Sequence, residues 1–451
     1  MAHRRPPLPP GPYLVVGLAR SGVAAALALA AARPGERIVA VDYARPKEAL
    51  AEWERLAAAG VEVHLESDGT QALEASPPPA TLVKSPGVPR DAPVVGQARR
   101  RGLEVVGELE LGWRMLPNEF IAVTGTNGKT TTVELIGAIH RVAGEPVAVA
   151  GNVGTPLTSL PGTAGNATVV CEASSFQLED SIAFAPEAAV FLNFSEDHLD
   201  RHASTADYLG AKLRIFANQH PSDLAVVNAR DADLLPGVGA RTVTFGDGDM
   251  RREGDMLVWR DDALIDAGEV RLRGEHNLNN AMAAAAVSLE RGIDREAVRT
   301  ALREFAGLPH RMERVAEIRG VEYVNDSKAT NPGAAAAALN AFGSGVHAIM
   351  GGSLKGGDFA QLESDVSASC RACYLIGQAA DRLAHDLSGS GVELVSCGDM
   401  ERAVAEASRR ARPGETVLLT PACASFDPYR DYEERGEHFR SLVEALAEEG
   451  R

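Results

Sequence analysis

Short apolar runs alternate with alanine-rich stretches along almost the whole chain. Runs such as 13–16, 120–123 and 416–419 are bounded by glycine, proline or charge, which is typical of strands buried on both faces of a parallel sheet. Stretches such as 23–32 and 277–291 have the length and composition of helices. This alternation predicts an α/β fold built on parallel sheets.

The predicted elements fall into three groups. The first has strands at 13–16, 37–41, 61–65, 81–84 and 104–106, with a turn at 17–22 before the helix 23–32. The second has strands at 120–123, 146–150, 168–171, 188–193 and 224–228, a hairpin-rich segment at 247–272, and helices at 277–291 and 295–305. The third has strands at 322–325, 347–350, 373–376, 393–396 and 416–419. We therefore expect three domains: a Rossmann-like domain at 1–107, a P-loop ATPase-like parallel sheet at 108–307, and a second Rossmann-like domain at 308–451.

The segment 124–132, Thr-Gly-Thr-Asn-Gly-Lys-Thr-Thr-Thr, joins a predicted strand to a predicted helix. In a phosphate-binding loop, glycines let backbone N–H groups approach a polyphosphate, a lysine neutralises phosphate oxygens and a hydroxyl binds Mg²⁺. Residue 123 is valine where the common motif has its first glycine, so a tight variant of the loop is predicted. The alternative is a plain glycine-rich turn with a solvated Lys129, but the strand–loop–helix order favours binding of ATP or GTP. The loop residues are Gly125, Thr126, Asn127, Gly128, Lys129, Thr130 and Thr131.

Composition narrows the class of protein. A net charge of −17 argues against nucleic-acid binding, which needs clustered lysine and arginine. Five cysteines are few and odd in number, so we expect a cytoplasmic protein without a disulfide framework. Cys370 and Cys373 have C-x-x-C spacing, which we interpret as neighbours on a helix because no second pair completes a zinc site. Glycine, proline and asparagine interrupt the longest uncharged stretches, so no membrane span is expected.

Polar residues at predicted strand ends are candidates for chemistry. Asp42 follows the 17–22 turn by about twenty positions, where a carboxylate can either meet a ribose or cap a turn. Glu172 ends the strand 168–171 and is predicted to meet Mg²⁺ beside the phosphate loop, with a solvated acid as the alternative. His198 stands among three acids and is a candidate metal ligand. Lys212 lies in a predicted helix and is expected to be a surface lysine.

Further candidates lie in the last third of the chain. Asn277 and Asn280 have helical i, i+3 spacing and can either read a base or ribose or cap the helix. Arg311 could reach a phosphate as charge develops there. Asp326 and Lys328 follow another predicted strand, where such a cluster is costly unless it is paired or binds a ligand.

Seven runs, GTNGKTTT, EASSFQLE, NFSEDHLDRH, GEHNLNN, GLPHRME, NDSKATNP and PACASFD, occur in this order and closely resemble those of the Mur ligases of peptidoglycan synthesis. The resemblance covers all three predicted domains, and SSFQLE and NDSKATNP are most similar to the member that adds D-glutamate. It implies a cytoplasmic, monomeric, ATP-dependent amide ligase for peptidoglycan precursors. Such an enzyme joins D-glutamate to UDP-N-acetylmuramoyl-L-alanine through an acyl phosphate and uses two Mg²⁺ ions.

The resemblance also implies a role for each matching residue. The catalytic residues would be Lys129, His198, Lys212, Arg311 and Lys328. ATP would be bound by the phosphate loop together with Asn277, Arg311, Asp326 and Lys328. The metal ligands would be Thr130, Glu172, His198 and Lys212, the last as a CO₂-derived carbamate. The UDP-linked substrate would contact Ser21, Asp42, Ser85, Gly87, Asn152 and Ser174. D-Glutamate would contact Thr330, Lys355, Ser425, Phe426 and Tyr432.

One departure from the family and two alternative functions stand beside this hypothesis. Ala19 and Ser21 occupy positions where relatives often have glycine and threonine, so the uridine contacts match the family least well. A folylpolyglutamate synthase-like ligase is one alternative, which the first βαβ unit, suited to a uridine nucleotide, disfavours. The other is a nucleotide-gated regulator without chemistry, which leaves Arg311 and Lys328 unexplained.

Overall fold

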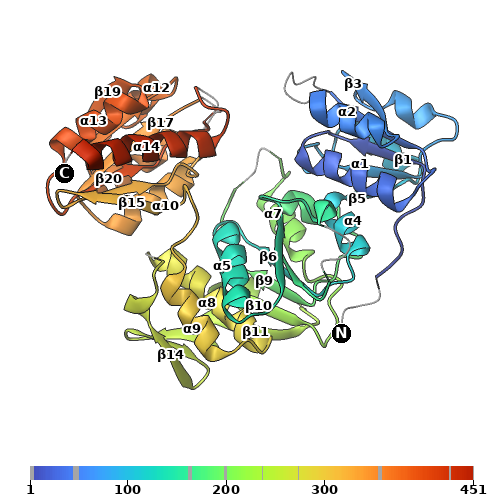
Figure 1. Ribbon diagram of the computed structural model, residues 1–451, viewed down its shortest axis with the longest axis horizontal. Coiled ribbons are helices and arrows are strands. Elements are labelled where there is room, and N and C mark those ends of the chain that lie inside the picture. The colour runs from blue at the N-terminus through green and yellow to red at the C-terminus, as the bar shows by residue number, and fades with distance from the viewer. Residues whose placement is uncertain are drawn as a thin grey trace. The chain divides into compact units, whose positions relative to one another are not determined.

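The computed structural model describes residues 5–43, 50–160, 165–197, 201–235, 237–272, 274–353, 358–425 and 428–449. The chain divides into two compact units (Figure 1). Met1–Val270 and His276–Phe305 form the first unit, and Arg271–Glu275 and Ala306–Arg451 form the second. The first unit contains two sheets and the second contains one, and most strand pairs are parallel, as the sequence predicts.

The first sheet is entirely parallel, with strand order β3-β2-β1-β4-β5. Its strands are β1 (Tyr13–Val16), β2 (Ile38–Asp42), β3 (Glu62–Leu65), β4 (Thr81–Lys84) and β5 (Glu104–Gly107), and its helices are α1 (Arg20–Ala32), α2 (Leu50–Ala58) and α3 (Pro93–Arg100). Helix α1 begins at Arg20 and not at residue 23 as predicted, because its first residues lie in the segment 17–22 that was predicted to be a turn. Gly22 lies inside the helix, where a Cβ atom would stand 1.8 Å from the carbonyl oxygen of Gly17. Only glycine allows this close approach of the turn to the helix.

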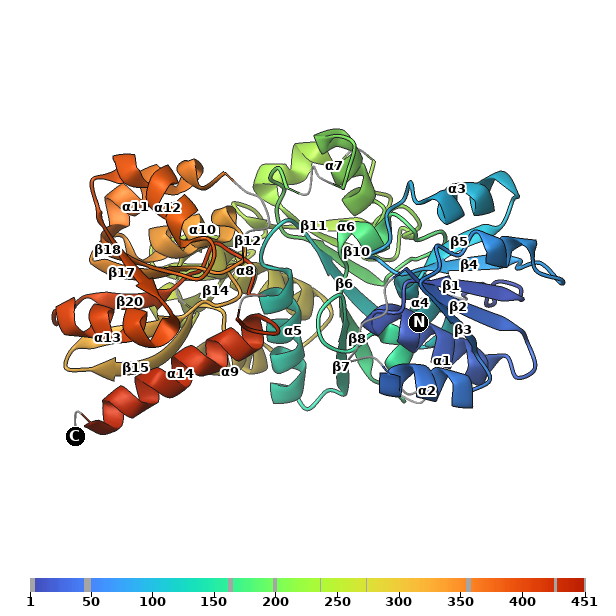
Figure 2. The ribbon, with the colours of Figure 1, turned by 90° about the horizontal axis from the view of Figure 1, so that it is seen from above.

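The second sheet has the order β14-β13-β12-β11-β10-β9-β6-β8-β7. Its strands are β6 (Phe120–Thr124), β7 (Val147–Gly151), β8 (Thr168–Glu172), β9 (Ala188–Phe191), β10 (Leu224–Asn228), β11 (Arg241–Gly246), β12 (Met250–Glu253), β13 (Met256–Trp259) and β14 (Asp262–Asp266). Its helices are α4 (Glu108–Met115), α5 (Lys129–Val142), α6 (Ser175–Leu178), α7 (Thr205–Leu213), α8 (Glu275–Glu290) and α9 (Arg295–Glu304). Helix α5 packs against β7, β8 and α9 (Figures 1 and 2). The antiparallel pairing of β12, β13 and β14 confirms the predicted hairpins. Strand β11 was missed, because polar residues interrupt its apolar positions.

Two buried acids hold helix α4, which directly follows β5 of the first sheet, against the second sheet. Glu108 accepts hydrogen bonds from the backbone N–H (2.7 Å) and the hydroxyl (2.8 Å) of Thr158. Burial raises the pKa of Glu108 to about 7, although these bonds act in the opposite direction. Glu110 accepts backbone hydrogen bonds from three successive residues, among them Phe184 at 2.9 Å. Helix α4, which carries both acids, therefore anchors the link between the two sheets.

The third sheet lies in the second unit and has the order β15-β16-β20-β17-β18-β19. Its strands are β15 (Glu313–Ile318), β16 (Val321–Asn325), β17 (Val346–Gly351), β18 (Cys370–Ile376), β19 (Glu393–Gly398) and β20 (Thr416–Leu419), and its helices are α10 (Pro332–Phe342), α11 (Glu363–Ser369), α12 (Ala380–Asp386), α13 (Met400–Arg410) and α14 (Tyr432–Glu449). Strand β15 pairs antiparallel with β16 and was missed, because its residues alternate with charges. The helical interpretation of Cys370 and Cys373 was wrong, since both belong to β18.

Each sheet has its own apolar core. Leu29 and Val83 belong to the core beside the first sheet, Phe120 and Phe191 to that of the second, and Leu339 to that of the third. Among the described residues, no helix has the length and apolarity needed to cross a bilayer.

Candidate functional site

The phosphate loop connects β6 to α5 at the edge where neighbouring parallel strands of the second sheet end. Strand β6 lies between β8 and β9, with Val123 beside Glu172 and Thr124 beside Phe191. Gly125 and Gly128 have φ angles of +152° and +86°, which side chains rarely allow. The predicted order of strand, glycine-rich loop and helix is therefore confirmed.

A second segment, residues 193–195, holds the phosphate loop in shape. The backbone N–H of Asn127 donates to the side-chain oxygen of Asn193 (2.9 Å), and the Asn193 amide donates back to the Asn127 carbonyl (3.1 Å). The backbone N–H of Ser195 donates to the Thr126 hydroxyl (3.1 Å). Lys129 donates to the carbonyls of Gly125 (3.0 Å) and Thr126 (2.9 Å). Asn193 was not among the predicted site residues, although its place two residues after a strand beside β6 was a usable signal.

Glu172 lies at the end of β8 and joins two other candidates. It accepts hydrogen bonds from the Thr130 hydroxyl (2.7 Å) and from the Asn152 amide (3.0 Å). The carboxylate is buried, so the alternative of a solvated strand-end acid is excluded. His198 lies outside the described residues, and no group of three or more His, Cys, Asp or Glu suited to a metal occurs within the described part of the chain.

The expectation that Lys212 lies on the surface was wrong. The side chain is 1% exposed and donates to the carbonyl of Gly125 at 2.6 Å. Its ammonium nitrogen lies 4.5 Å from the centre of the Tyr208 ring, which is also buried. Burial, with a smaller contribution from the charge of Lys129, lowers the pKa of Lys212 to about 6, although Asp197 and Glu172 oppose the shift. Helix α7 thus brings an unusually acidic ammonium to the phosphate loop.

Asn277 and Asn280 lie inside α8, so they do not cap it. Both side chains are buried, and the Asn280 amide donates to Asn277 at 3.2 Å. A Cβ atom at Gly128 would stand 2.1 Å from the side-chain oxygen of Asn280. The helix therefore places the Asn280 amide directly against the phosphate loop, with Asn277 bonded to it, and its alanine-rich remainder packs in the core.

The candidates for the UDP-linked substrate lie mostly at the carboxyl ends of β1, β2 and β4. Asp42 accepts a 2.6 Å hydrogen bond from the backbone N–H of Leu18, so its carboxylate holds the turn before α1. The Ser85 hydroxyl donates to the Gly17 carbonyl at 2.6 Å. Ser21 is half-buried in the first turn of α1, and Gly87 is exposed. These residues therefore share one edge of the first sheet.

Ser174 lies between Glu172 and helix α6. Its hydroxyl accepts a hydrogen bond from the backbone N–H of Gln177 (3.3 Å), and the Gln177 side chain accepts one from the backbone N–H of Ser174 (3.1 Å). This reciprocal arrangement is a capping box, which explains the Ser174–Gln177 spacing structurally. Ser174 is 8% exposed.

In the second unit, Asp326 follows β16 and is buried among polar partners. It accepts a 3.0 Å hydrogen bond from the backbone N–H of Met312. Burial raises the pKa of Asp326 to about 6, while the charges of Arg311 and Lys328 lower it. His310 and Met312, on either side of Arg311, have φ angles of +62° and +48°. Strained backbone of this kind persists only where surrounding contacts enforce it.

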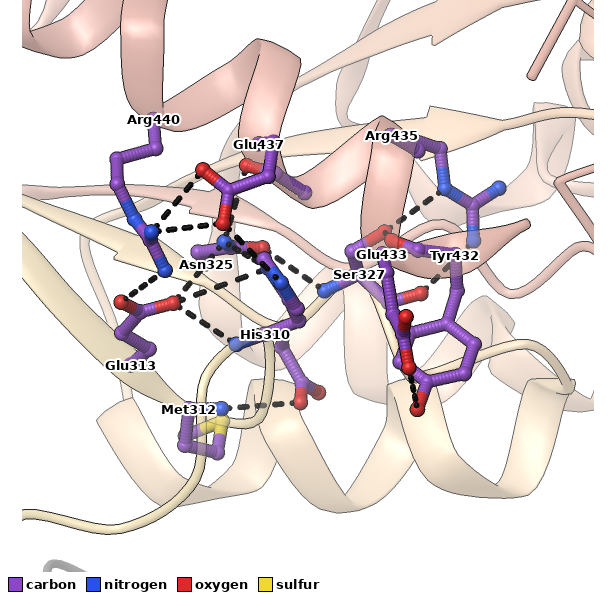
Figure 3. A network of polar contacts seen from close by, with 12 residues as sticks. His310, Met312, Glu313, Asn325, Ser327, Tyr432, Glu433, Arg435, Glu437 and Arg440 are labelled. Atoms are coloured by element: carbon purple, nitrogen blue, oxygen red, sulfur yellow. Dashed lines mark hydrogen bonds and ion pairs between the residues drawn. The ribbon is translucent and has the colours of Figure 1, made fainter. Parts of the chain in front are cut away.

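Helix α14 fastens this part of the second unit (Figure 3). Arg435 is 1% exposed and donates to the Ser327 hydroxyl (3.0 Å) and carbonyl (2.8 Å), and to the Cys423 carbonyl (3.1 Å). Burial lowers the pKa of Arg435 to about 10. The Ser327 hydroxyl in turn donates to the carbonyl of Tyr432 at 2.7 Å, which lies at the start of α14.

The D-glutamate candidates are only partly described. Ser425 is buried and Thr330 is half-buried. The Tyr432 ring lies 5.6 Å from the ammonium nitrogen of Lys328. Lys355 and Phe426 lie outside the described residues.

Comparison with known proteins agrees with this geometry. Residues 123–288 match the Mur ligase middle domain, and residues 310–423 match the glutamate ligase domain of Mur ligases. A UDP-N-acetylmuramoylalanine–D-glutamate ligase of Pelotomaculum thermopropionicum is 40% identical, over 96% of this chain and 97% of the relative. An enzyme of the same name from Geobacter metallireducens is 42% identical, over 96% and 97%. The solved UDP-N-acetylmuramate–alanine ligase MurC of Thermotoga maritima has the same fold, with a TM-score of 0.61 at 19% identity over 96% of this chain and 99% of that one. The relatives at 40% and 42% identity over almost the whole chain show that it belongs to the Mur ligase family, and the fold agrees.

Proposed function

We propose that this chain is an ATP-dependent ligase that joins D-glutamate to UDP-N-acetylmuramoyl-L-alanine and releases ADP and phosphate. Relatives that match almost the whole chain are named UDP-N-acetylmuramoylalanine–D-glutamate ligases, and this name contains both proposed substrates. The observation that carries the proposal is the Thr130–Glu172 pair at the end of the phosphate loop, with Lys212 buried against the same loop. This arrangement gathers oxygen ligands and the side chains of Lys129 and Lys212 at one phosphate site.

The reaction requires two anions to meet, the alanyl carboxylate and the γ-phosphate of ATP, so charge neutralisation is its main demand. Backbone N–H groups of the loop and the Lys129 ammonium would bind the phosphates. The oxygens of Thr130 and Glu172 fit Mg²⁺, which when bound neutralises phosphate charge. The carboxylate attacks the γ-phosphorus and ADP leaves. The neutral amine of D-glutamate then attacks the acyl carbon of the resulting acyl phosphate and loses one proton, and phosphate leaves with the electron pair of the broken C–O bond.

The buried amine of Lys212 suits conversion to a carbamate. A pKa of about 6 leaves this amine neutral at physiological pH, as attack on CO₂ requires. Its nitrogen would bond to the carbon of CO₂ and lose one proton, which gives an anionic carbamate whose oxygens would hold a second Mg²⁺ together with His198. Removing CO₂ should lower the activity of the wild-type chain, and bicarbonate should restore it. The variant Lys212→Ala should stay inactive under both conditions, whereas wild-type activity that ignores CO₂ removal contradicts the carbamate.

The remaining assignments follow the family resemblance. We assign the sheet edge at Ser21, Asp42, Ser85 and Gly87, with Asn152 and Ser174, to the UDP-linked substrate. We assign Asn277, Arg311, Asp326 and Lys328 to ATP, and Thr330, Lys355, Ser425, Phe426 and Tyr432 to D-glutamate. The three domains would be 1–107, 108–307 and 308–451, with the chain acting as a monomer in the cytoplasm.

Phosphate release from ATP tests the proposed function. The assay contains Mg²⁺ and UDP-N-acetylmuramoyl-L-alanine, with D-glutamate, L-glutamate or L-lysine added separately. Release that depends on both the UDP-linked substrate and D-glutamate supports the ligase. Release with a pteroate substrate and L-glutamate would favour the folylpolyglutamate synthase-like alternative, and nucleotide binding without release would favour a regulator.

A further inference from the structure

Arg201 has a set of contacts that the proposed chemistry does not use. Its guanidinium donates to three successive backbone carbonyls of the loop after β4: Pro86 (3.1 Å), Gly87 (3.3 Å) and Val88 (3.4 Å). The same group lies 4.8 Å from the centre of the Phe176 ring. Phe176 belongs to α6 of the second sheet, so Arg201 joins the two sheets of the first unit (α6 and β4 are labelled in Figure 2).

A series of aromatic side chains connects Arg201 to the phosphate loop. The Phe176 ring stacks on His202 at 5.3 Å with an interplanar angle of 7°. The His202 ring lies 5.2 Å from the Tyr208 ring. The Tyr208 hydroxyl donates to the Thr126 hydroxyl at 3.3 Å. A series of contacting rings, the first pair stacked and the second tilted at 46°, therefore runs from Arg201 to the phosphate loop.

A second set of contacts, made by Lys84, holds the loop at residues 86–88 against the second sheet. The Lys84 ammonium donates to the Val88 carbonyl at 2.9 Å and lies 2.8 Å from the Asp180 carboxylate. The Lys84 and Asp180 side chains are 0% and 1% exposed. Burial raises the pKa of Asp180, although the charge of Lys84 opposes this shift. The loop is thus held by the buried ion pairs of Lys84 with Asp180 and Glu179 and by the half-buried Arg201.

Hydrogen bonds within the first sheet also hold the loop in shape. The Ser85 hydroxyl donates to the Gly17 carbonyl at 2.6 Å, and the backbone N–H of Ser85 donates to the Val16 carbonyl at 3.0 Å. The backbone N–H of Val88 closes the turn onto the Ser85 carbonyl at 3.0 Å. The turn is thus closed by bonds that do not involve Arg201, and the Arg201 bonds tie its carbonyls to the second sheet.

We propose that Arg201 is a positioning residue that sets the spacing between the loop at 86–88 and the phosphate loop. This proposal rests on the proposed function, in which the UDP end of the substrate meets Ser85 and Gly87 and the alanyl carboxylate must reach the phosphate loop. A ligand that spans both sheets needs this spacing, whereas UDP alone needs only the first sheet. If the spacing is already fixed in the free protein, the two binding surfaces do not have to be ordered when the ligand binds, so the affinity is higher.

Calorimetric titration of the full chain with two ligands tests the proposal. We expect Arg201→Ala to weaken binding of UDP-N-acetylmuramoyl-L-alanine on the order of tenfold, which is the size of one or two charge-assisted hydrogen bonds. Binding of UDP should change by less than about twofold, because the bonds of Ser85 to Gly17 and Val16 and the turn closed by Val88 stay in place without Arg201. Arg201→Lys keeps the charge but not the flat stacking group, so its loss should be intermediate. Phe176→Leu removes only the ring and should act in the same direction.

Steady-state kinetics and a surface variant complete the design. Arg201→Ala should raise the KM for the UDP-linked substrate, while the KM for D-glutamate stays unchanged. Arg402, whose side chain is 78% exposed in the second unit, provides the control Arg402→Ala, which should match the wild type. Equal losses of affinity for UDP and for the complete substrate overturn the proposal, because Arg201 would then contact UDP or maintain the fold. Unchanged affinity for both ligands overturns it as well. If the wild-type chain binds UDP but not the complete substrate, the proposed function itself fails, and the proposal with it.

Discussion

Lys212 is the residue whose protonation differs most clearly from that of an ordinary side chain. In the folded chain it releases its proton at a pH of about 6, whereas an unfolded lysine keeps its proton to about pH 10.5. Between these values the unfolded chain binds more protons, so the free energy of unfolding rises with pH and falls as the pH drops toward 6. We expect Lys212→Met to remove this dependence, which amounts to at most about 1.4 kcal/mol per pH unit. Urea unfolding in CO₂-free buffer at several pH values above neutrality measures it. Parallel curves for the wild type and the variant would show that Lys212 is charged in the folded chain.

The Thr130–Glu172 pair makes a separate prediction about Mg²⁺. Glu172→Gln keeps the size of the side chain but removes a charge that attracts the ion, so the Mg²⁺ concentration for half-maximal phosphate release should rise about tenfold or more. Thr130→Val should act similarly because it removes the hydroxyl, while Thr130→Ser keeps the hydroxyl and serves as the matched control. An unchanged Mg²⁺ dependence in both Glu172→Gln and Thr130→Val refutes the metal site.

At the level of elements, helix α5 offers a matched pair of glycines. Gly128 at its start and Gly144 just after its end have φ angles of +86° and +75°. Alanine at either site costs about 1 kcal/mol for the left-handed backbone. Only Gly128→Ala also meets a neighbour, with its Cβ 2.1 Å from the Asn280 side-chain oxygen, since nothing lies within 4 Å of a Cβ at Gly144.

We therefore expect Gly144→Ala to lose about 1 kcal/mol of stability and to keep its affinity for ADP. Gly128→Ala should lose more stability and much of its ADP affinity, as measured by urea unfolding and nucleotide titration. The double variant Gly128→Ala/Asn280→Gly should recover part of the lost stability, because the clash is gone. Equal losses for the two single variants would mean that Asn280 does not press on the loop.

The sequence predicted strands well where burial was uniform and missed them where it was not. Thr81–Lys84, Leu224–Asn228 and Thr416–Leu419 have the predicted bounds, because each is buried along its whole length. Strands β11 and β15 carry polar residues on a half-exposed face, so their apolar runs are too short to recognise. Lys212 was wrongly predicted to lie on the surface, because a charged residue in a short helix usually faces solvent. Its spacing of four from Tyr208 placed it on the buried face of α7, and that signal was available.

In the molecule as a whole, each of the two units has its own apolar core. Leu339 is fully buried in the core of the second unit, and Leu29 is fully buried beside the first sheet. Leu339→Ala should destabilise the second unit by about 2–5 kcal/mol and leave UDP affinity unchanged, because the proposed UDP contacts belong to the first unit. Leu29→Ala should destabilise the first unit to a similar extent and weaken UDP binding.

Differential scanning calorimetry separates these effects, since units with independent cores can unfold in separate transitions. UDP at about one hundred times its dissociation constant should stabilise the first unit alone, by about 2.7 kcal/mol. Leu339→Ala should then lower the transition that UDP does not move, and Leu29→Ala should lower the one that it does. A single transition that shifts with both variants and with UDP would mean that the two units unfold as one cooperative body, and losses of UDP affinity in both variants would lead to the same conclusion.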